Sequence, residues 1–209
     1  MRKIACIVIL SFSINVCAQD VHFSQFLVNS FMLNPAMIGV QKNDYKATLI
    51  RKSQWESVSV PFNTFTLAIE RKDIFPSHSI GIQFLNDVAG DSRFKTSGLI
   101  INYVKSVATS KENIFRFGAE FGLFQRSIFI DDLVFIDTEN LSNFNFTFPD
   151  ISLGFANQKI LNKKLSLEAG IAFFHINKPK QSFNDDDAIR LNQKINFHTS
   201  LNYIYMDKF

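Results

Sequence analysis

Residues 115–123 read FRFGAEFGL, and this stretch alternates strictly between two kinds of side chain. Its odd positions are apolar, whereas its even positions are arginine, glutamate or glycine. A period of two is typical of a β-strand whose faces meet different environments, because successive side chains point to opposite sides of a sheet. The stretch therefore predicts a sheet with one apolar and one hydrated face.

The alternation recurs along the chain and predicts an all-β protein. It is found again in residues 80–84, 151–155, 165–173 and 195–205. Residues 22–37 differ, since their apolar side chains fall near helical spacing until Pro35, and this predicts a short helix or folded lead-in. Hydrophobic runs separated by turn residues then predict eight antiparallel strands, at residues 45–55, 63–71, 79–86, 94–107, 114–128, 150–157, 164–176 and 194–206.

The first 18 residues have the features of a secretory signal peptide. A basic pair precedes an apolar run over residues 4–12, and cleavage is expected after Ala18. A lipoprotein signal would need small residues before Cys17, which Val16 fits poorly. Because Cys6 and Cys17 both lie in this peptide, the mature chain is expected to contain no disulfide and no thiolate metal site.

Charge and hydropathy exclude several classes of protein. Without Arg2 and Lys3, the 22 basic residues fall to 20 against 19 acidic ones, so the expected mature net charge is +1. That value does not fit a nucleic-acid-binding protein. No run approaches the roughly 18 to 20 apolar residues of a spanning helix. A membrane would therefore be crossed by strands, which the 24 phenylalanines also favour.

The apolar face is expected to lie outside a barrel. The opposite face carries charged and small residues, which suit a narrow hydrated lumen. The longest predicted strands also exceed the usual five or six residues and approach the roughly nine to eleven of a tilted membrane strand. The charged or titratable residues that share the lumen parity are Arg116, Glu120, Glu168, Lys194 and His198.

Connection lengths predict which end of the barrel faces which compartment. Residues 131–149 and 177–192 form long connections, whereas 161–163 is short. Outer-membrane barrels have short periplasmic turns and long external loops. The predicted organisation is therefore a signal peptide at 1–18, a periplasmic lead-in at 19–43 and a β-barrel domain at 44–209.

Five blocks of sequence occur in order along the chain, namely His22-Phe23-Ser24-Gln25-Phe26, Asn34-Pro35-Ala36 with Gly39, Arg51-Lys52-Ser53-Gln54-Trp55, Gly81 to Asp87 and Asn177 to Phe183. They resemble, in the same order, segments of the PorP/SprF family of type IX secretion outer-membrane proteins. The resemblance implies a Bacteroidetes-type outer-membrane β-barrel that assists secretion or surface display of type IX substrates, in some members gliding-motility adhesins. The implied partners are outer-membrane lipid, the secretion machinery and the secreted substrate proteins.

Barrel closure has two interpretations. The family usually has several more strands, and Met206-Asp207-Lys208-Phe209 resembles a turn leading into another one. Against this, Leu201, Tyr203, Tyr205 and Phe209 share one parity, as in the assembly signal of complete barrels, and eight strands can close. We favour an incomplete family member, although an unclosed sheet would leave costly unpaired edges in lipid.

The four histidines do not predict a metal or catalytic site. His198 falls on the polar parity, whereas His175 follows the apolar parity near an interface, so we expect them to face opposite sides. A metal site needs convergent ligands, and a structural or solvated role is favoured for both. His22 and His78 lie in different predicted connections and add no spacing motif.

The acidic residues are interpreted as structural. Asp185-Asp186-Asp187 could bind calcium, but the segment lacks the alternating ligands and glycine of a known loop, so a solvated turn is favoured. Glu120 and Glu168 occupy matching strand positions and are expected to pair with Arg116 across the lumen. A charge ladder is favoured over acid/base catalysis.

Two further features have structural interpretations. Asn34-Pro35-Ala36 is explained best as a helix stop and the entry to the first strand, because proline restricts the residue before it. Trp55 is the sole tryptophan and sits on the apolar parity at a predicted strand end. There its ring can be buried in lipid while its N–H stays hydrated, so it is expected to anchor an interface.

The sequence therefore predicts a non-enzymatic outer-membrane component of type IX secretion, without cofactor, metal, nucleic acid or small-molecule substrate. Loops and the N-terminal segment are expected to bind substrates or machinery, with contact residues, cargo and oligomeric state unknown. One alternative is an outer-membrane hydrolase or acyltransferase that uses Ser200 and His198, which share parity. Another is a soluble exported barrel that binds an apolar ligand between inward Phe115, Phe117, Phe121 and Phe173.

Overall fold

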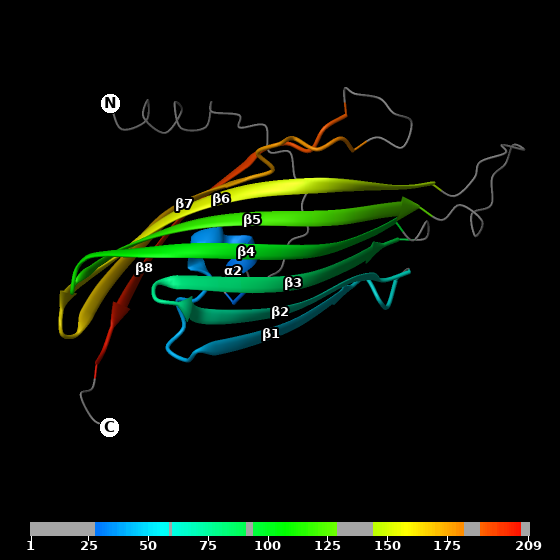
Figure 1. Cartoon of the computed structure of the whole chain (residues 1–209). Coiled ribbons are helices and arrows are strands. Elements are labelled where there is room, and N and C mark those ends of the chain that lie inside the picture. The colour runs from blue at the N-terminus through cyan, green and yellow to red at the C-terminus, as the bar shows by residue number, and fades with distance from the viewer. Residues whose placement is uncertain (1–27, 59, 91–93, 129–143, 182–188, 206–209) are drawn as a thin grey trace, which may run out of the picture.

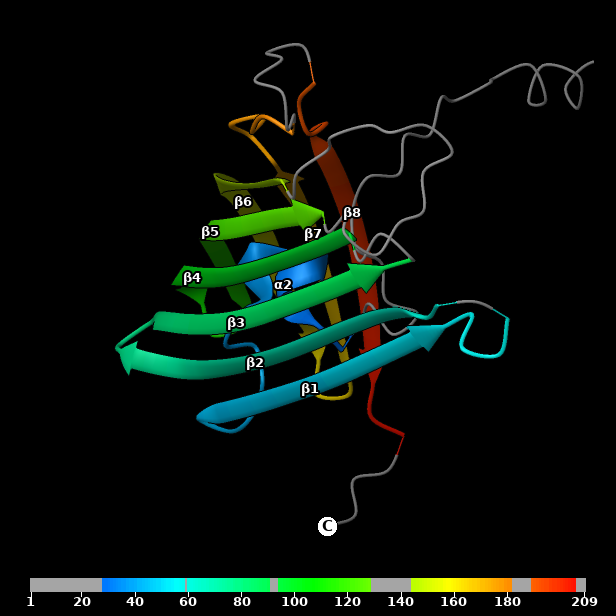
Figure 2. The same ribbon diagram turned by 90° about the vertical axis from the view of Figure 1, so that its right-hand side faces the viewer.

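The chain folds into one antiparallel sheet of eight strands in chain order, strongly curled into a half-barrel (Figures 1 and 2). The computed structural model describes residues 28–58, 60–90, 94–128, 144–181 and 189–205. The all-β prediction and the predicted strand order are confirmed. The strands are β1 (Tyr45–Gln54), β2 (Phe62–Phe75), β3 (His78–Ala89), β4 (Phe94–Ser110), β5 (Asn113–Ile128), β6 (Phe144–Asn162), β7 (Leu165–Phe174) and β8 (Lys194–Tyr203).

The largest difference from the predicted boundaries is in β6, which has 19 residues. Its first six residues were expected in a long loop, but they continue the ladder with β5, for example Thr147 opposite Gln125. The extension was not predicted because its aromatic residues lie on the inner face of the strand, whereas the predicted pattern places apolar residues on the outer face. Phe148 is buried there and stacks on Phe124, with ring centroids 5.5 Å apart.

The two faces of the sheet have the predicted orientation. Phe117, Phe121 and Phe173 are 52%, 50% and 43% exposed on the convex face. The inward placement of these phenylalanines, on which the alternative of a soluble ligand-binding barrel depended, is therefore wrong. The concave face instead buries polar and charged side chains, namely Thr48, Thr66, Glu70, Gln83, Asn102, Arg116, Glu120, Ser152 and Glu168.

A short helical segment fills the inside of the curl (Figures 1 and 2). It consists of helix α2 (Ser30–Leu33) and the 3₁₀ turn η1 (Pro35–Met37), so the predicted short helix is confirmed within the described residues. Phe31 of α2 is buried with Ile38 and with side chains from β2 and β4. The small apolar core of the protein thus lies between this segment and the concave face.

The sheet is open in the described part of the chain. β1 pairs with β2 and β8 pairs with β7, and no ladder joins β1 to β8 among these residues. The alternative of an eight-stranded barrel closed on itself is therefore not what the described strands form. None of the described helices is long and apolar enough to cross a bilayer.

Candidate functional site

The segment Asn29–Gly39, here called the plug, rests on three glycines of the concave face. These are Gly118 on β5, Gly154 on β6 and Gly170 on β7, here called the glycine seat. A Cβ atom added to Gly118 would lie 2.4 Å from the backbone nitrogen of Ala36. One added to Gly154 would lie 2.0 Å from Asn34 Oδ1. The plug can approach the sheet this closely only because the seat has no side chains.

Asn34 fastens the plug to the sheet backbone. Its side chain is fully buried, and its Nδ2 donates to the carbonyl oxygens of Phe155 at 3.1 Å and Ile171 at 3.2 Å. Its Oδ1 accepts from the Ala36 N–H at 2.8 Å and caps η1. Asn34 also ends α2, so the predicted helix stop is confirmed, and the first strand begins at Tyr45 as predicted. An isolated buried amide would be costly, and these bonds satisfy it.

Side chains of β1, β2 and β8 complete the attachment. Asn196 of β8 donates to the carbonyls of Met32 at 3.2 Å and Leu33 at 3.3 Å, near the C-terminal end of α2. Helix ends leave such carbonyls without intrahelical partners. Lys46 of β1 donates to Ser30 at 2.8 Å and pairs with Glu70 of β2 at 2.9 Å.

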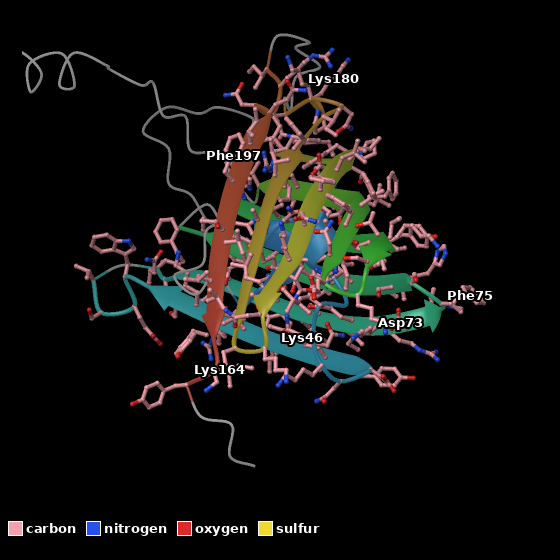
Figure 3. The ribbon with its side chains drawn as sticks, turned by 90° about the vertical axis from the view of Figure 1, so that its left-hand side faces the viewer. Lys46, Asp73, Phe75, Lys164, Lys180 and Phe197 are labelled. Carbon is pink, nitrogen blue, oxygen red and sulfur yellow. The ribbon has the colours of Figure 1, made fainter. Side chains whose placement is uncertain are left out.

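The opposite directions of side chains on the sheet are visible in Figure 3. Phe197 lies on the outer side of β8, whereas Lys46 reaches the inside of the curl. Glu70 also accepts from the Gly39 N–H at 3.2 Å. The same carboxylate therefore binds the C-terminal end of the plug directly and its N-terminal end through Lys46, which bonds Ser30. Polar contacts from both edges of the sheet therefore hold the plug.

One of the two predicted lumen charge pairs is present. Arg116 Nη1 lies 3.7 Å from Glu168 Oε2, and Arg116 Nη2 donates to Gln158 at 2.8 Å. Glu120 does not share this guanidinium. It accepts from Asn102 at 3.3 Å instead, because four residues along β5 separate Glu120 from Arg116. These contacts support the structural charge ladder in part.

Cavities lie toward both ends of the concave face in the described part of the chain. Toward the long connections, a cavity of about 90 Å³ is lined by Phe31, Glu120, Asp150 and Lys194 among others. Toward the short turns, a wider one of about 880 Å³ is lined by residues that include Glu168 and the short-turn ends of β6 to β8. Both cavities combine apolar with polar and charged lining residues.

The structure corrects the placement of two histidines. His175 was expected to face outward, but β7 ends at Phe174 and His175 has a φ of +57°, so the strand alternation does not reach it. Its ring is buried inside and bonds Asp150 at 2.9 Å. His78 was expected in a connection but is the first residue of β3, where its ring bonds Tyr103 and Lys105.

The hydrolase alternative finds no support in the geometry. His198 lies on the inner parity of β8 as expected, but within the described residues its ring nitrogens have no hydrogen-bond partner, Ser200 included. A nucleophile and its base need hydrogen-bond contact. No group of three His, Cys, Asp or Glu side chains that could hold a metal occurs in the described ranges. The predicted signal peptide, His22 and Asp185 to Asp187 lie outside them.

The family of the chain follows from a comparison with family models. The model described as "Type IX secretion system membrane protein PorP/SprF" matches residues 15–208, which include the plug, the seat and all eight strands. The chain belongs to this family. No curated protein and no solved structure matches it.

The PorP/SprF plug was missed by sequence reasoning, although a signal for it was present. The motif Asn34-Pro35-Ala36 matched the family, and the three seat glycines share the inward parity. Gly118 and Gly154 are directly opposite each other in the β5–β6 ladder. The sequence analysis assigned the small residues of this face only to a narrow hydrated lumen. Their contact with a segment more than 80 residues earlier cannot be predicted from a local pattern.

Trp55 lies just after β1 and is 63% exposed, and its interface role stays a prediction.

Proposed function

We propose that this PorP/SprF protein is a non-enzymatic outer-membrane component of type IX secretion. It assists the export or surface attachment of type IX substrates, which include gliding-motility adhesins. The observation that carries the membrane placement is the inverted sheet, with buried charges such as Arg116 and Glu168 inside and exposed phenylalanines outside. This arrangement favours a lipid environment, because lipid-facing and lumen-facing residues alternate in such barrels.

The plug supports a role in which substrates contact the ends of the barrel. Its backbone contacts the sheet directly at the glycine seat, so it occupies the middle of the described lumen. We expect binding to the secretion machinery and to substrates through the connections at the two ends and through the segment that precedes the plug.

Deletion of the gene tests the proposed role directly. Surface display of type IX substrates is measured by antibody labelling of intact cells, in the deletion strain and in the same strain complemented with the wild-type gene. Loss of display that complementation restores is expected. Unchanged display in the deletion strain would contradict a required role in export.

Cell fractionation tests the proposed location separately. The protein is expected in the outer-membrane fraction and should resist extraction with sodium carbonate, because its convex face is apolar. An outer-membrane barrel marker and a periplasmic marker serve as controls. Recovery with the periplasmic marker would exclude the membrane location.

A further inference from the structure

The convex face carries a cationic cluster next to an apolar groove, at the short-turn end of β1 to β4. We propose that this surface binds one phospholipid, with the headgroup phosphate at Arg71 and Lys105 and an acyl chain in the groove. The site deepens the membrane placement proposed above and rests on it. It does not depend on which substrates are exported.

The first part of the headgroup site is a chain of hydrogen bonds across β3 and β4. His78 and Lys105 are opposite in the ladder, and Lys105 Nζ bonds His78 Nε2 at 2.6 Å. The other ring nitrogen, Nδ1, bonds the Tyr103 hydroxyl. An ammonium only donates, so Nε2 must accept and the ring proton must sit on Nδ1, where it is donated to Tyr103.

This bonding pattern leaves donors available for an anion. Tyr103 accepts from the ring, so its own O–H is free to donate, and Lys105 has two further N–H groups. Within the described residues neither side chain has another hydrogen-bond partner. A phosphate diester carries the acceptor oxygens and the negative charge that such donors recognise.

A second cation lies on the same face of the sheet, two residues farther from the β2–β3 turn than the His78–Lys105 pair. Arg71 of β2 places its guanidinium over the ring of Tyr45 of β1, 5.4 Å from the centroid. Tyr45, Arg71, Ile80 and Tyr103 are successive partners in the ladders, so they form one row across four strands. Tyrosines and basic residues at this depth are typical of a membrane interface. The two cations therefore lie on opposite sides of β3, with Arg71 beside Ile80 and Lys105 beside His78, at the edge of the apolar band.

The groove distinguishes a lipid from a free phosphate. It begins at the row of Tyr45 and Arg71 and continues along the convex face with a volume of about 360 Å³. Its walls are almost entirely aliphatic and aromatic, and most are exposed. A phosphate anchored at the row would carry its acyl chain into this groove, which is lined by Leu67, Ile69, Ile80, Ile82, Phe84 and Leu99.

Native mass spectrometry of the full-length protein in detergent, titrated with phosphatidylglycerol, tests the site. The double variant Arg71→Gln/Lys105→Gln is expected to weaken phosphatidylglycerol binding about fivefold for each charge removed. Lys111→Gln is the matched control, because Lys111 is exposed in the next turn at the same end of the sheet, and it should bind as the wild type does. Equal affinity of the double variant and the wild type would overturn the proposal.

Two further arms separate the headgroup from the acyl chain. Diacylglycerol with the same acyl chains lacks the phosphate, so it should bind the wild type more weakly than phosphatidylglycerol does. Its affinity for the wild type and for the double variant should be equal. Leu67→Trp should weaken phosphatidylglycerol binding by filling the groove. If millimolar inorganic phosphate displaces the lipid and Leu67→Trp has no effect, the site binds free phosphate and the lipid proposal fails.

Folding and export are followed independently. Heat-dependent mobility on gels reports folding of each variant, and Tyr103→Phe, which removes only a hydroxyl, keeps the test decisive if the double variant does not fold. Surface display is then measured in the deletion strain that carries the double variant. Loss of lipid binding with normal display supports the site alone, whereas a wild-type protein that binds lipid but is not needed for display would refute only the secretion role.

Discussion

The concave and convex faces of the same strands carry opposite chemistry on adjacent residues. On β4, Asn102 is fully buried while Ile101 is 44% exposed, and on β5, Glu120 is 8% exposed while Phe121 is 50% exposed. A water-soluble sheet would bury the apolar member of each pair. The comparison shows that an apolar solvent stabilises the outer face and that hydrogen bonds and ion pairs must stabilise the inner one.

The two faces also differ in how closely they must fit their surroundings. In the proposed location the convex face meets fluid lipid, so it needs apolar character and little shape complementarity. The concave face meets the plug at defined atoms, as the contact between Gly118 and the Pro35–Ala36 backbone shows. The effect of a substitution on stability should therefore depend on side-chain polarity on the convex face and on shape or hydrogen-bond and charge pairing on the concave face. The following four predictions test this difference.

Breaking the inner ion pair should have the largest effect. Arg116→Leu leaves Glu168 with a carboxylate that is only 9% exposed and without its cation, which should cost about 3–5 kcal/mol of unfolding free energy. Urea unfolding from lipid vesicles measures this cost. The double variant Arg116→Leu/Glu168→Leu should recover much of it, and a double variant as unstable as the single one would show that the pair itself is not the cause.

A charge on the outer face should have the next largest effect. Ile101→Arg places a guanidinium in the apolar band and should reduce the unfolding free energy by about 2–4 kcal/mol in the same vesicle assay. Ile101→Phe is the control and should be nearly neutral, because the site needs only an apolar side chain. A neutral Ile101→Arg would mean that the convex face meets water.

Added side-chain volume should destabilise the protein at a concave-face residue but not at its neighbour on the convex face. Gly118→Val forces an isopropyl group, beginning with its Cβ atom, against the plug backbone and should cost at least about 1–3 kcal/mol. Ala119→Val, one residue later and exposed on the convex face, should change stability by less than about 0.5 kcal/mol. Protease cleavage within the plug should also increase in Gly118→Val only. Similar stability of the two variants would contradict close packing at the seat.

Loss of a single plug contact should have the smallest effect. Asn196→Ala removes the donor to the Met32 and Leu33 carbonyls and should cost about 0.5–1.5 kcal/mol. Asn202→Ala, on the same parity of β8 but exposed near its end, serves as the control in thermal unfolding. If both variants unfold at the wild-type temperature, β8 does not hold the plug.

Local patterns predicted the strands well where the side chains on the two faces of the sheet differ in polarity. In β5 the predicted start differs from the observed one by a single residue, because alternation persists along the whole strand. In β6 and β7 the pattern failed at the ends. At the start of β6, the apolar residues Phe146 and Phe148 lie on the inner parity instead of the outer one. At the end of β7, the positive φ of His175 ends the alternation.

The sequence by itself determined the strand order, the outward face and the family, because these depend on side-chain periodicity and on contiguous motifs. Only the tertiary structure decided that Asn34-Pro35-Ala36 seats on Gly118, Gly154 and Gly170, and that Arg116 pairs with Glu168 and not with Glu120. Those contacts join residues that are distant along the chain. Their geometry depends on ladder register and sheet curvature, and both emerge only when all the strands are paired.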